Sequence, residues 1–351
     1  MNNHSSLVSI LLPNLNTRPF LEERMATILN QTYSNWELII ADSYSEDGSW
    51  EYLSRFPAED SRITAYQIPR GLYQAWNFCL EKAKGEYIYI ATSDDTMIPE
   101  CIEKMVSALE AHPECDICDS ALGYIDESGH ETTREGNCFV DYARDREHIR
   151  TAPHDGLLSL AGLTVYCSIT QIMFRRKLLQ KTGMFSTAYG PQGDYQWGMY
   201  AGFAANVIYL PQKLSSWRVR KEQATVRSED AVGLLGAKIF LKHVAMAEEC
   251  VFNLQQSQPQ LLKWLKPRKL LKVMRFRKML LIVTGDFPLT LKLKNTCQYF
   301  LQYPEELLIY PYLFMKKRLF RLGDLSLYRT YHYINEIKEF QQYFCTKNEN
   351  E

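Results

Sequence analysis

A short apolar run that ends on two acids restricts the fold of this chain more than any other feature. Residues Tyr87 to Ala91 are aromatic, β-branched or small, and the run is too short for a helix, so it predicts a buried strand. Asp94 and Asp95 follow on the loop that leaves the carboxyl end of this strand. Adjacent carboxylates repel each other unless a cation or hydrogen-bond donors compensate them, and hard divalent cations prefer such oxygens. The loop therefore predicts a metal–diphosphate site, with a solvated turn as the alternative.

Strand-like runs alternate with amphipathic segments through the first hundred residues. The runs Leu7–Leu12, Glu37–Ala41 and Ile63–Ile68 predict strands, and the segments between them carry apolar residues at helical spacing. Repeats of this length predict an α/β fold with a parallel sheet and right-handed crossovers. The carboxyl ends of parallel strands meet at one edge, where such sheets bind ligands. The polar residues expected at this edge are Asn14, Asn16, Asp42, Arg70, Gly71, Asp94 and Asp95.

Three stretches resemble, in order, motifs of the family-2 inverting glycosyltransferases. They are VSILLPNLNTRPFLEERMATILNQTYSNWELIIADSYSEDGSWEYL, GLYQAWNFCLEKAKGEYIYIATSDD and CSITQIMFRRKLLQKTGMFS. The resemblance covers about residues 7–227, and the ordered set is more specific than any single motif. It implies a GT-A fold, which is a Rossmann-like mixed and mainly parallel sheet flanked by helices. It also implies a nucleotide-sugar donor, usually with Mn²⁺ or Mg²⁺.

The resemblance assigns nucleotide-binding roles to residues that follow the first three strands. Pro13 and Asn14 match the end of the family's first strand. Asp42 matches the acid that hydrogen-bonds the base, commonly uracil, because a carboxylate accepts from a ring N–H. Arg70 and Gly71 lie where a cation reaches the base or the diphosphate. A turn or helix cap remains the alternative for each residue taken separately.

The same resemblance divides the two adjacent acids between ribose and metal. Asp94 matches the acid near the donor ribose, and Asp95 matches the ligand of the metal between the phosphates. The metal neutralises charge on the departing nucleoside diphosphate. Thr92 occupies a position where many relatives have a further acid or Asn, so metal binding depends mainly on Asp95.

A carboxylate in the segment GPQGDYQW is expected to act as the catalytic base. Asp194 precedes an aromatic helical segment, where it is expected to cap the helix, and the free backbone N–H groups are expected to lower its proton affinity. The resemblance assigns Asp194 as the base that takes the proton of the acceptor hydroxyl, as inverting transfer requires. Gly193 replaces the family's usual Glu. A helix cap without catalytic function is the alternative.

Basic residues after a further predicted strand are expected to contact the diphosphate. The segment SSWRVRKEQATVRS resembles the family's YRxHxxxxS-like segment, with Arg220 in place of His. Arg218, Arg220 and Lys221 are expected to form a flexible cationic lid over the diphosphate. A solvated basic loop is the alternative.

Residues 134–163 lack clear periodicity and contain His148 and His154. A long irregular stretch in a compact domain is often a binding loop, so we expect it to contact the acceptor. Both histidines are expected at the surface rather than in catalysis.

The chain is expected to divide into a GT-A catalytic domain at residues 1–230 and a mainly helical, basic and aromatic region at 231–351. Within the second region, Lys263–Lys278 carries eight Lys or Arg residues among apolar ones. This pattern fits either an interfacial helix on an anionic membrane or a packed helix with a solvated basic face. Nucleic-acid binding is not expected, because no recognisable module accompanies the patch.

Composition places the chain among ordinary globular proteins. Of its 351 residues, 46% are hydrophobic and 23% are charged, and no run approaches the roughly 18–20 apolar residues of a spanning helix. The nine cysteines are scattered and the amino terminus lacks the features of a signal peptide, so a cytoplasmic location is expected. Peripheral attachment to the inner face of the membrane is an alternative that the sequence leaves open. The sequence does not indicate the oligomeric state.

Together these features predict a metal-dependent inverting glycosyltransferase. It would move a sugar from a nucleotide-sugar, expected to be a UDP-sugar, to a hydroxyl of a glycan or lipid-linked acceptor in polysaccharide biosynthesis. The alternative is a catalytically degenerate GT-A domain that binds glycans or acts as a scaffold, because fold resemblance alone does not decide activity.

Overall fold

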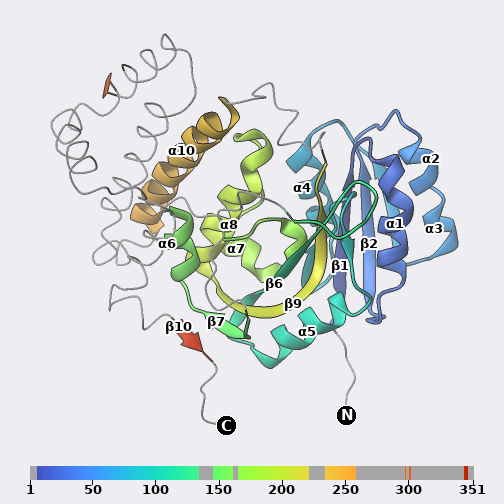
Figure 1. Ribbon diagram of the computed structural model, residues 1–351, viewed down its shortest axis with the longest axis horizontal. Helices are drawn as coiled ribbons and strands as arrows, with labels where there is room; N and C mark the ends of the chain where they lie inside the picture. Colours follow the sequence, from blue (N-terminus) through green and yellow to red (C-terminus); the bar gives the residue numbers. More distant parts are fainter. Residues whose placement is uncertain are drawn as a thin grey trace. The chain divides into compact units, whose positions relative to one another are not determined.

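The structure is a computed structural model in which residues 6–133, 145–160, 165–220, 234–257, 297, 300–301 and 344–346 are described (Figure 1). These residues belong to two compact units, of which the first draws on Met1–Leu157, Thr164–Gln223 and Gln342–Glu351. The elements of the first unit are β1 (Val8–Asn14), α1 (Arg18–Leu29), β2 (Trp36–Asp42), α2 (Ser49–Leu53), α3 (Phe56–Glu59), β3 (Ile63–Gln67), α4 (Leu72–Lys82), β4 (Tyr87–Ile90), β5 (Thr96–Met97), α5 (Cys101–Ala111), β6 (Cys115–Ile125), β7 (His148–Arg150), α6 (His154–Leu160, which ends in the second unit), β8 (Ile172–Arg175), α7 (Leu179–Thr182), α8 (Gly193–Ala204), β9 (Asn206–Arg218) and β10 (Phe344–Thr346).

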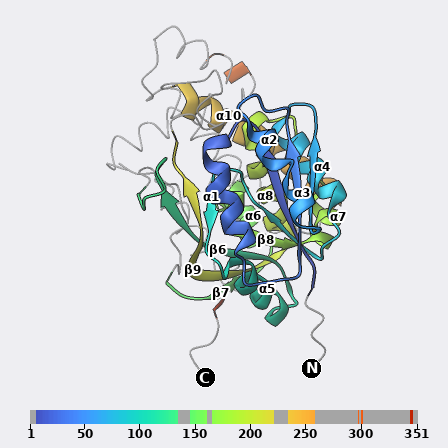
Figure 2. The same ribbon diagram turned by 90° about the vertical axis from the view of Figure 1, so that its right-hand side faces the viewer.

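The first half of the sheet is parallel, as the alternating strands and helices predict. Its strands lie in the order β3-β2-β1-β4, with Asn14 opposite Asp42, Asp42 opposite Gln67, and Leu11 opposite Ile90. Figure 2 shows helices α1, α2, α3 and α4 gathered around the blue strands of this half. The register therefore brings the carboxyl ends of all four strands to one edge. The loops that leave them hold the polar residues singled out in the sequence.

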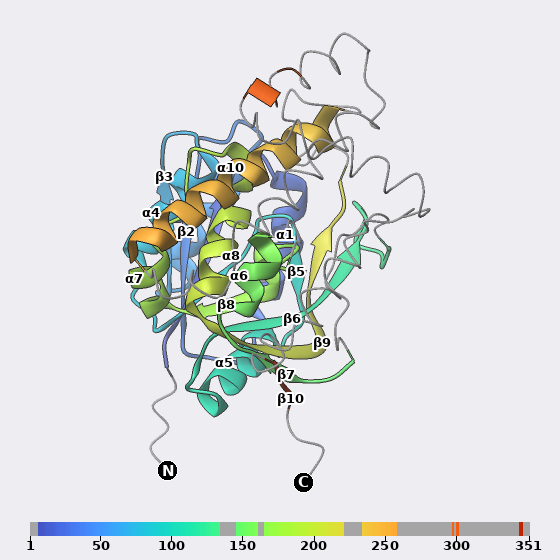
Figure 3. The same cartoon turned by 90° about the vertical axis from the view of Figure 1, so that its left-hand side faces the viewer.

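The second half of the sheet is mixed. β8 pairs antiparallel with both β4 and β6, and β6 runs parallel to the long strand β9 (Figure 3). β7 and β10 complete that side, and the short strand β5 pairs with the end of β9 through Thr96 and Ser216. This last pairing brings the end of β9 next to the Asp94–Asp95 loop. The arrangement is the α/β GT-A fold expected from the resemblance.

Helices cover both faces of the sheet because the strands are apolar on both sides. In β1, Val8, Ile10 and Leu12 pack in one core cluster with α1 and α5, whereas Leu11 packs in the other with α4 and α8. Two apolar residues at the ends of these helices are exposed. Leu29 is the last residue of α1, and Leu72 is the first residue of α4 and lies at the ligand-binding edge.

The second unit is described mainly by helix α10 (Leu234–Ser257), which confirms the helical pattern expected from about residue 231. Its buried residues are Met246, Ala247, Cys250, Val251 and Leu254. Among the described helices, none has the length and apolar character needed to cross a bilayer. The basic segment 263–278, Lys221, residues 134–144 and the predicted domain boundary at residue 230 lie outside the described residues, so those expectations stay predictions.

Candidate active site

The ends of β1 and β2 form a buried hydrogen-bonded unit. Asp42 is fully buried, and its Oδ2 accepts hydrogen bonds from Asn14 Nδ2 at 2.7 Å and from Ser45 Oγ at 2.6 Å. Its Oδ1 accepts from the backbone N–H of Ser45 at 2.9 Å. Pro13 is buried in the same strand, opposite Ala41. The observed contacts make Asp42 an organiser of the loop after β2, and its contact with a nucleobase stays a prediction.

Arg70 and Gly71 lie at the same edge, after β3. The Arg70 guanidinium is exposed, pairs with Glu46 at 2.6 Å and donates to the Tyr44 carbonyl at 3.4 Å. Gly71 precedes α4, and a Cβ at this position would lie 2.3 Å from the Gln74 side chain. Arg70 therefore joins the loops after β2 and β3, and its guanidinium is exposed to solvent.

The two adjacent acids after β4 differ in environment. Asp95 is buried, and it accepts hydrogen bonds from the Thr92 hydroxyl and, at 2.9 Å, from the backbone N–H of Arg218. Burial and the neighbouring charge of Asp94 raise the pKa of Asp95 to about 7. Asp94 is half-buried and forms an ion pair with Arg220. When both acids are ionised, their negative charges repel each other, and a bound cation would stabilise them.

Arg218 does not belong to a flexible lid, so that expectation is wrong for this residue. It is the last residue of β9 and is buried, and its guanidinium donates to the Asp94 carbonyl at 2.7 Å and the Asp126 carbonyl at 2.9 Å. It also forms an ion pair with Glu23. A guanidinium with its donors used in this way fastens the acidic loop to β9. Arg220 is the basic residue of this segment that contacts an acid of the site, Asp94.

The donor groups near Asp95 fit a hard divalent cation in chemical type. Two carboxylates and the Thr92 hydroxyl are oxygen ligands of the kind that Mg²⁺ and Mn²⁺ take, and a cation would offset the cost of ionising buried Asp95. Within the described part of the chain, no group of three or more His, Cys, Asp or Glu side chains is placed to hold a metal. The ion would therefore take its remaining ligands from phosphate oxygens and water.

Asp194 occupies the first turn of α8 rather than the position that caps it. The helix begins at Gly193, and Asp194 Oδ1 accepts from the Tyr195 backbone N–H at 2.8 Å and from the Tyr73 hydroxyl at 3.0 Å. Burial raises its pKa, and these two hydrogen bonds oppose the rise. The expected lowering of its proton affinity is therefore wrong, because desolvation outweighs the N–H donors. A buried carboxylate with a raised pKa is suited to accept a proton near neutral pH.

Gly193 leaves no room for the Glu that the resemblance implies at this position. A Cβ at Gly193 would lie 2.3 Å from the Ser186 carbonyl oxygen and 2.7 Å from the Tyr73 ring. The same Tyr73 ring is stacked on Phe185, and its hydroxyl also donates to the Pro191 carbonyl at 3.1 Å. Tyr73, in the first turn of α4, thus links Asp194 to the edge of the sheet.

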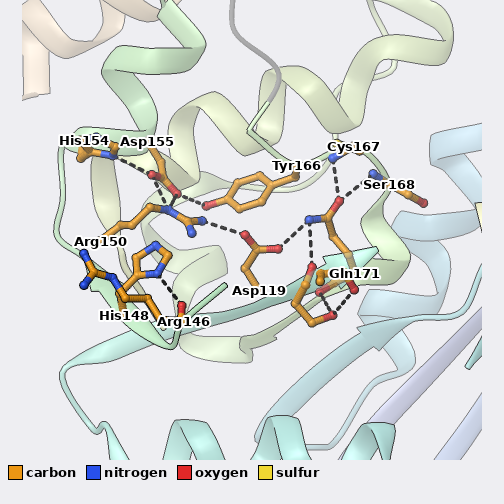
Figure 4. A network of polar contacts seen from close by, with 12 residues as sticks. Asp119, Arg146, His148, Arg150, His154, Asp155, Tyr166, Cys167, Ser168 and Gln171 are labelled. Atoms are coloured by element: carbon orange, nitrogen blue, oxygen red, sulfur yellow. Dashed lines mark hydrogen bonds and ion pairs between the residues drawn. The ribbon is translucent and has the colours of Figure 1, made fainter. Parts of the chain in front are cut away.

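His148 and His154 are buried, which contradicts the expectation of surface positions. Both lie beside a buried ionic network centred on Arg150, in which His154 Nδ1 contacts Asp155 Oδ1 at 3.0 Å (Figure 4). Arg150 Nε donates to both oxygens of Asp155, at 2.9 and 3.0 Å, and its terminal nitrogen donates to Asp119 at 2.8 Å. The described part of the stretch 134–163 is therefore packed into the fold, and acceptor contact by this stretch stays a prediction.

Two residues near the acids were not found from the sequence. Tyr73 had no signal beyond its place at the start of a helix, since its partner Asp194 lies 121 residues away. Arg24 follows the helical period of α1 but is fully buried, and its charge opposes the rise in the pKa of Asp95. A buried cation on an apolar helix face is the signal that could have indicated a nearby anion.

The mixed α/β sheet has the GT-A fold of a glycosyltransferase domain. The model of the family described as "Glycosyl transferase family 2" matches residues 9–183. The putative glycosyltransferase EpsH of Bacillus subtilis (strain 168) is 30% identical over 247 residues, which are 69% of this chain and 69% of EpsH. This chain therefore belongs to glycosyl transferase family 2.

Further likenesses agree with this family but cover less or are more distant. The putative teichuronic acid biosynthesis glycosyltransferase TuaG, also of Bacillus subtilis (strain 168), is 33% identical over 126 residues, or 35% of this chain and 49% of TuaG. The chain spans about half the length of curated relatives such as this one. The solved structure of the mannosyltransferase PcManGT from Pyrobaculum calidifontis, in complex with GDP-Man and Mn²⁺, has a TM-score of 0.52 and 18% identity and covers 86% of this chain and 82% of that one. The last likeness concerns the fold alone.

Proposed function

We propose that this protein is a metal-dependent inverting glycosyltransferase that uses a nucleotide-sugar, with a UDP-sugar as the first donor to test. The observation that supports the proposal most is the pair of acids after β4, with Asp95 buried and its pKa raised to about 7. Keeping two such carboxylates together is costly for stability alone. A divalent cation bound with a diphosphate accounts for them.

Asp194 is the proposed base. In a single displacement, the acceptor hydroxyl oxygen attacks the anomeric carbon while the bond from that carbon to the diphosphate oxygen breaks. The hydroxyl proton passes to Asp194, and attack opposite the leaving group inverts the anomeric centre. The Tyr73 hydrogen bond at 3.0 Å fixes the orientation of the carboxylate. Its raised pKa makes it a stronger base than a solvated carboxylate.

Asp95 is the residue that would hold the metal, which supplies charge neutralisation for the departing diphosphate when bound, and Asp94 is the acid proposed to lie near the donor ribose. Thr92 orients Asp95 by donating to it, and the Arg218 backbone N–H fixes its second oxygen. Arg220, which contacts Asp94, would add positive charge beside the phosphates. The mannosyltransferase complex with GDP-Man and Mn²⁺ supports a nucleotide-sugar and a metal in a related fold.

The acceptor is proposed to be a hydroxyl of a glycan or lipid-linked intermediate in polysaccharide biosynthesis. TuaG is named for teichuronic acid biosynthesis, which supports polysaccharide biosynthesis as the setting. Contact of Lys263–Lys278 with an anionic membrane remains a prediction that would place the enzyme near such an acceptor.

Binding measurements test the donor site directly. Isothermal titration with UDP, UDP-sugars and GDP-sugars, with and without Mn²⁺, would be compared for the wild type, Asp95→Ala and the control Glu81→Ala, an exposed acid near the end of α4. We expect metal-dependent binding of one nucleotide-sugar that Asp95→Ala loses and Glu81→Ala keeps. Absence of nucleotide binding with every metal would reject the enzyme and favour a degenerate domain that binds glycans.

A further inference from the structure

Tyr44 has a backbone conformation that a bulky residue rarely adopts. It follows β2, and its φ of 50° lies in the left-handed region. This region disfavours side chains with a Cβ, and bulky residues held there are concentrated at functional sites. The side chain gains only partial burial in return, because Tyr44 is 52% exposed. An aromatic ring is therefore presented to solvent at a cost in backbone energy.

The loop around Tyr44 is fastened on both sides, which explains how this conformation persists. On one side, Ser45 donates to buried Asp42 through its backbone N–H at 2.9 Å and its hydroxyl at 2.6 Å. On the other side, the Glu46 backbone N–H donates to Asn16 Oδ1 at 2.8 Å. The Tyr44 carbonyl accepts from Arg70. These bonds determine the loop without help from the Tyr44 ring, so folding does not require the ring.

Exposed apolar side chains accompany Tyr44 at the same edge. Leu15 follows β1 and Leu72 begins α4, and each is 42% exposed. The hydrogen bond from Asn16 N–H to Ser45 Oγ at 2.9 Å joins the loop of Leu15 to that of Tyr44, and Arg70 joins the loop of Leu72. An aromatic ring with apolar neighbours and one adjacent cation is suited to the face of a planar heterocycle.

The position of Tyr44, Leu15 and Leu72 relative to Asp94 and Asp95 indicates which part of the donor they would contact. β1 lies between β2 and β4, so the end of β2 is two strand spacings, about 10 Å, from the end of β4. With the diphosphate at Asp94 and Asp95, the rest of a nucleotide extended across the strand ends would bring its base to the loops after β1, β2 and β3. An acceptor hydroxyl must instead reach Asp194 in α8, which accepts a hydrogen bond from the Tyr73 hydroxyl.

We infer that the Tyr44 ring is the platform on which the nucleobase of the donor stacks, and that Asp42 positions this loop. The inference rests on the proposed function and adds a residue that binds the nucleoside of the donor. Stacking accepts any base, so Tyr44 would supply affinity for the nucleoside. Discrimination between bases would come from polar groups at the rim.

The test compares binding of UDP and of inorganic pyrophosphate in the presence of Mn²⁺. Tyr44→Asn removes the ring and keeps a residue that tolerates the left-handed region, Tyr44→Phe keeps the ring, and Leu29→Asn is a control at the far end of α1. We expect Tyr44→Asn to weaken UDP binding by about 5- to 150-fold, the range found for loss of one base stack. Pyrophosphate binding should stay unchanged, as should UDP binding by Tyr44→Phe and Leu29→Asn.

Thermal unfolding separates lost binding from lost folding. The melting temperature of Tyr44→Asn should equal or exceed that of the wild type, because the backbone cost is relieved. Unchanged UDP affinity in Tyr44→Asn, or an equal loss of pyrophosphate affinity, would overturn the inference while the donor site itself stands. A raised acceptor KM with unchanged UDP affinity would overturn it in favour of acceptor binding. If the wild type binds pyrophosphate and UDP equally, the inference falls, and if it binds neither, the proposed function falls first.

Discussion

Removing the charge of Arg150 should destabilise the fold more than any exposed charge substitution. The side chains of Arg150, Asp119 and Asp155 are only 7%, 4% and 2% exposed, and Arg150 makes three hydrogen bonds to the two carboxylates. Arg150→Met keeps much of the aliphatic stem and leaves both acids buried without a counter-charge. Breaking a buried pair in this way costs about 3–5 kcal/mol of the free energy of unfolding.

The loss should depend on pH with a definite sign. Burial opposes ionisation of Asp155, but Arg150 and His154 outweigh it and hold the pKa of Asp155 below its ordinary value. Such a group stabilises the fold above its unfolded pKa, and the contribution is lost as the pH falls through the folded pKa. In Arg150→Met burial dominates, so the folded-state pKa of the carboxyls rises and protonation favours folding. The difference from the wild type should therefore be largest at neutral pH and shrink below about pH 5.

Urea denaturation with linear extrapolation measures this difference. The control is Lys213→Met, which breaks the exposed pair with Glu131 and should leave the free energy of unfolding nearly unchanged, because solvent screens exposed pairs. Adding Asp155→Asn to Arg150→Met should restore part of the stability, because one uncompensated charge is removed. A cost for Arg150→Met as small as that of Lys213→Met, or one that grows as the pH falls, would refute the reasoning.

Three further predictions concern His148, Tyr73 and Gly193. Burial lowers the pKa of His148 from 6.5 to about 4, so the unfolded chain binds this proton at a higher pH than the folded chain does. The free energy of unfolding should therefore fall by on the order of 3 kcal/mol as the pH is lowered from 6.5 to about 4. His148→Gln should flatten the profile of melting temperature against pH over this range. Tyr73→Phe removes a hydrogen bond that lowers the pKa of Asp194, so kcat should fall about 10-fold and the acid limb of the pH–rate profile should move to higher pH; an unmoved limb would contradict this role. Gly193→Ala forces its Cβ against the Ser186 carbonyl, so we expect about 1–3 kcal/mol lost in urea unfolding and a lower kcat, whereas wild-type values for both would show that the loop gives way freely.

The parallel half of the fold could be predicted because its signals are local. The strand expected at Leu7–Leu12 is Val8–Asn14, and the strand expected at Glu37–Ala41 is Trp36–Asp42. Each is apolar on both faces and is followed by a polar loop, so the shared edge follows from the topology. The small shifts at strand ends arise because pairing with the neighbouring strand, rather than residue type, decides where a strand stops.

The second half depends on contacts between residues far apart in the chain, which no local pattern reveals. β6 pairs with β9 about ninety positions later, and this pairing decides that Arg218 is buried. His148 and His154 looked like surface residues because their buried surroundings come from other elements. The sign of the pKa shift of Asp194 was missed for the same reason, since a helix N-terminus was visible in the sequence but burial was not.

The role of Asp194 as the base is tested most directly by separating transfer from donor binding. Asp194→Asn keeps the shape of the side chain, and its amide oxygen can still accept from Tyr73 and from the Tyr195 backbone N–H. Sugar transfer and the Kd for UDP with Mn²⁺ would be measured on the same preparation. We predict that transfer is abolished while the Kd stays within about twofold of the wild type, because the base touches the acceptor proton and not the nucleotide. Transfer that persists, or nucleotide binding that is lost together with transfer, would contradict the account.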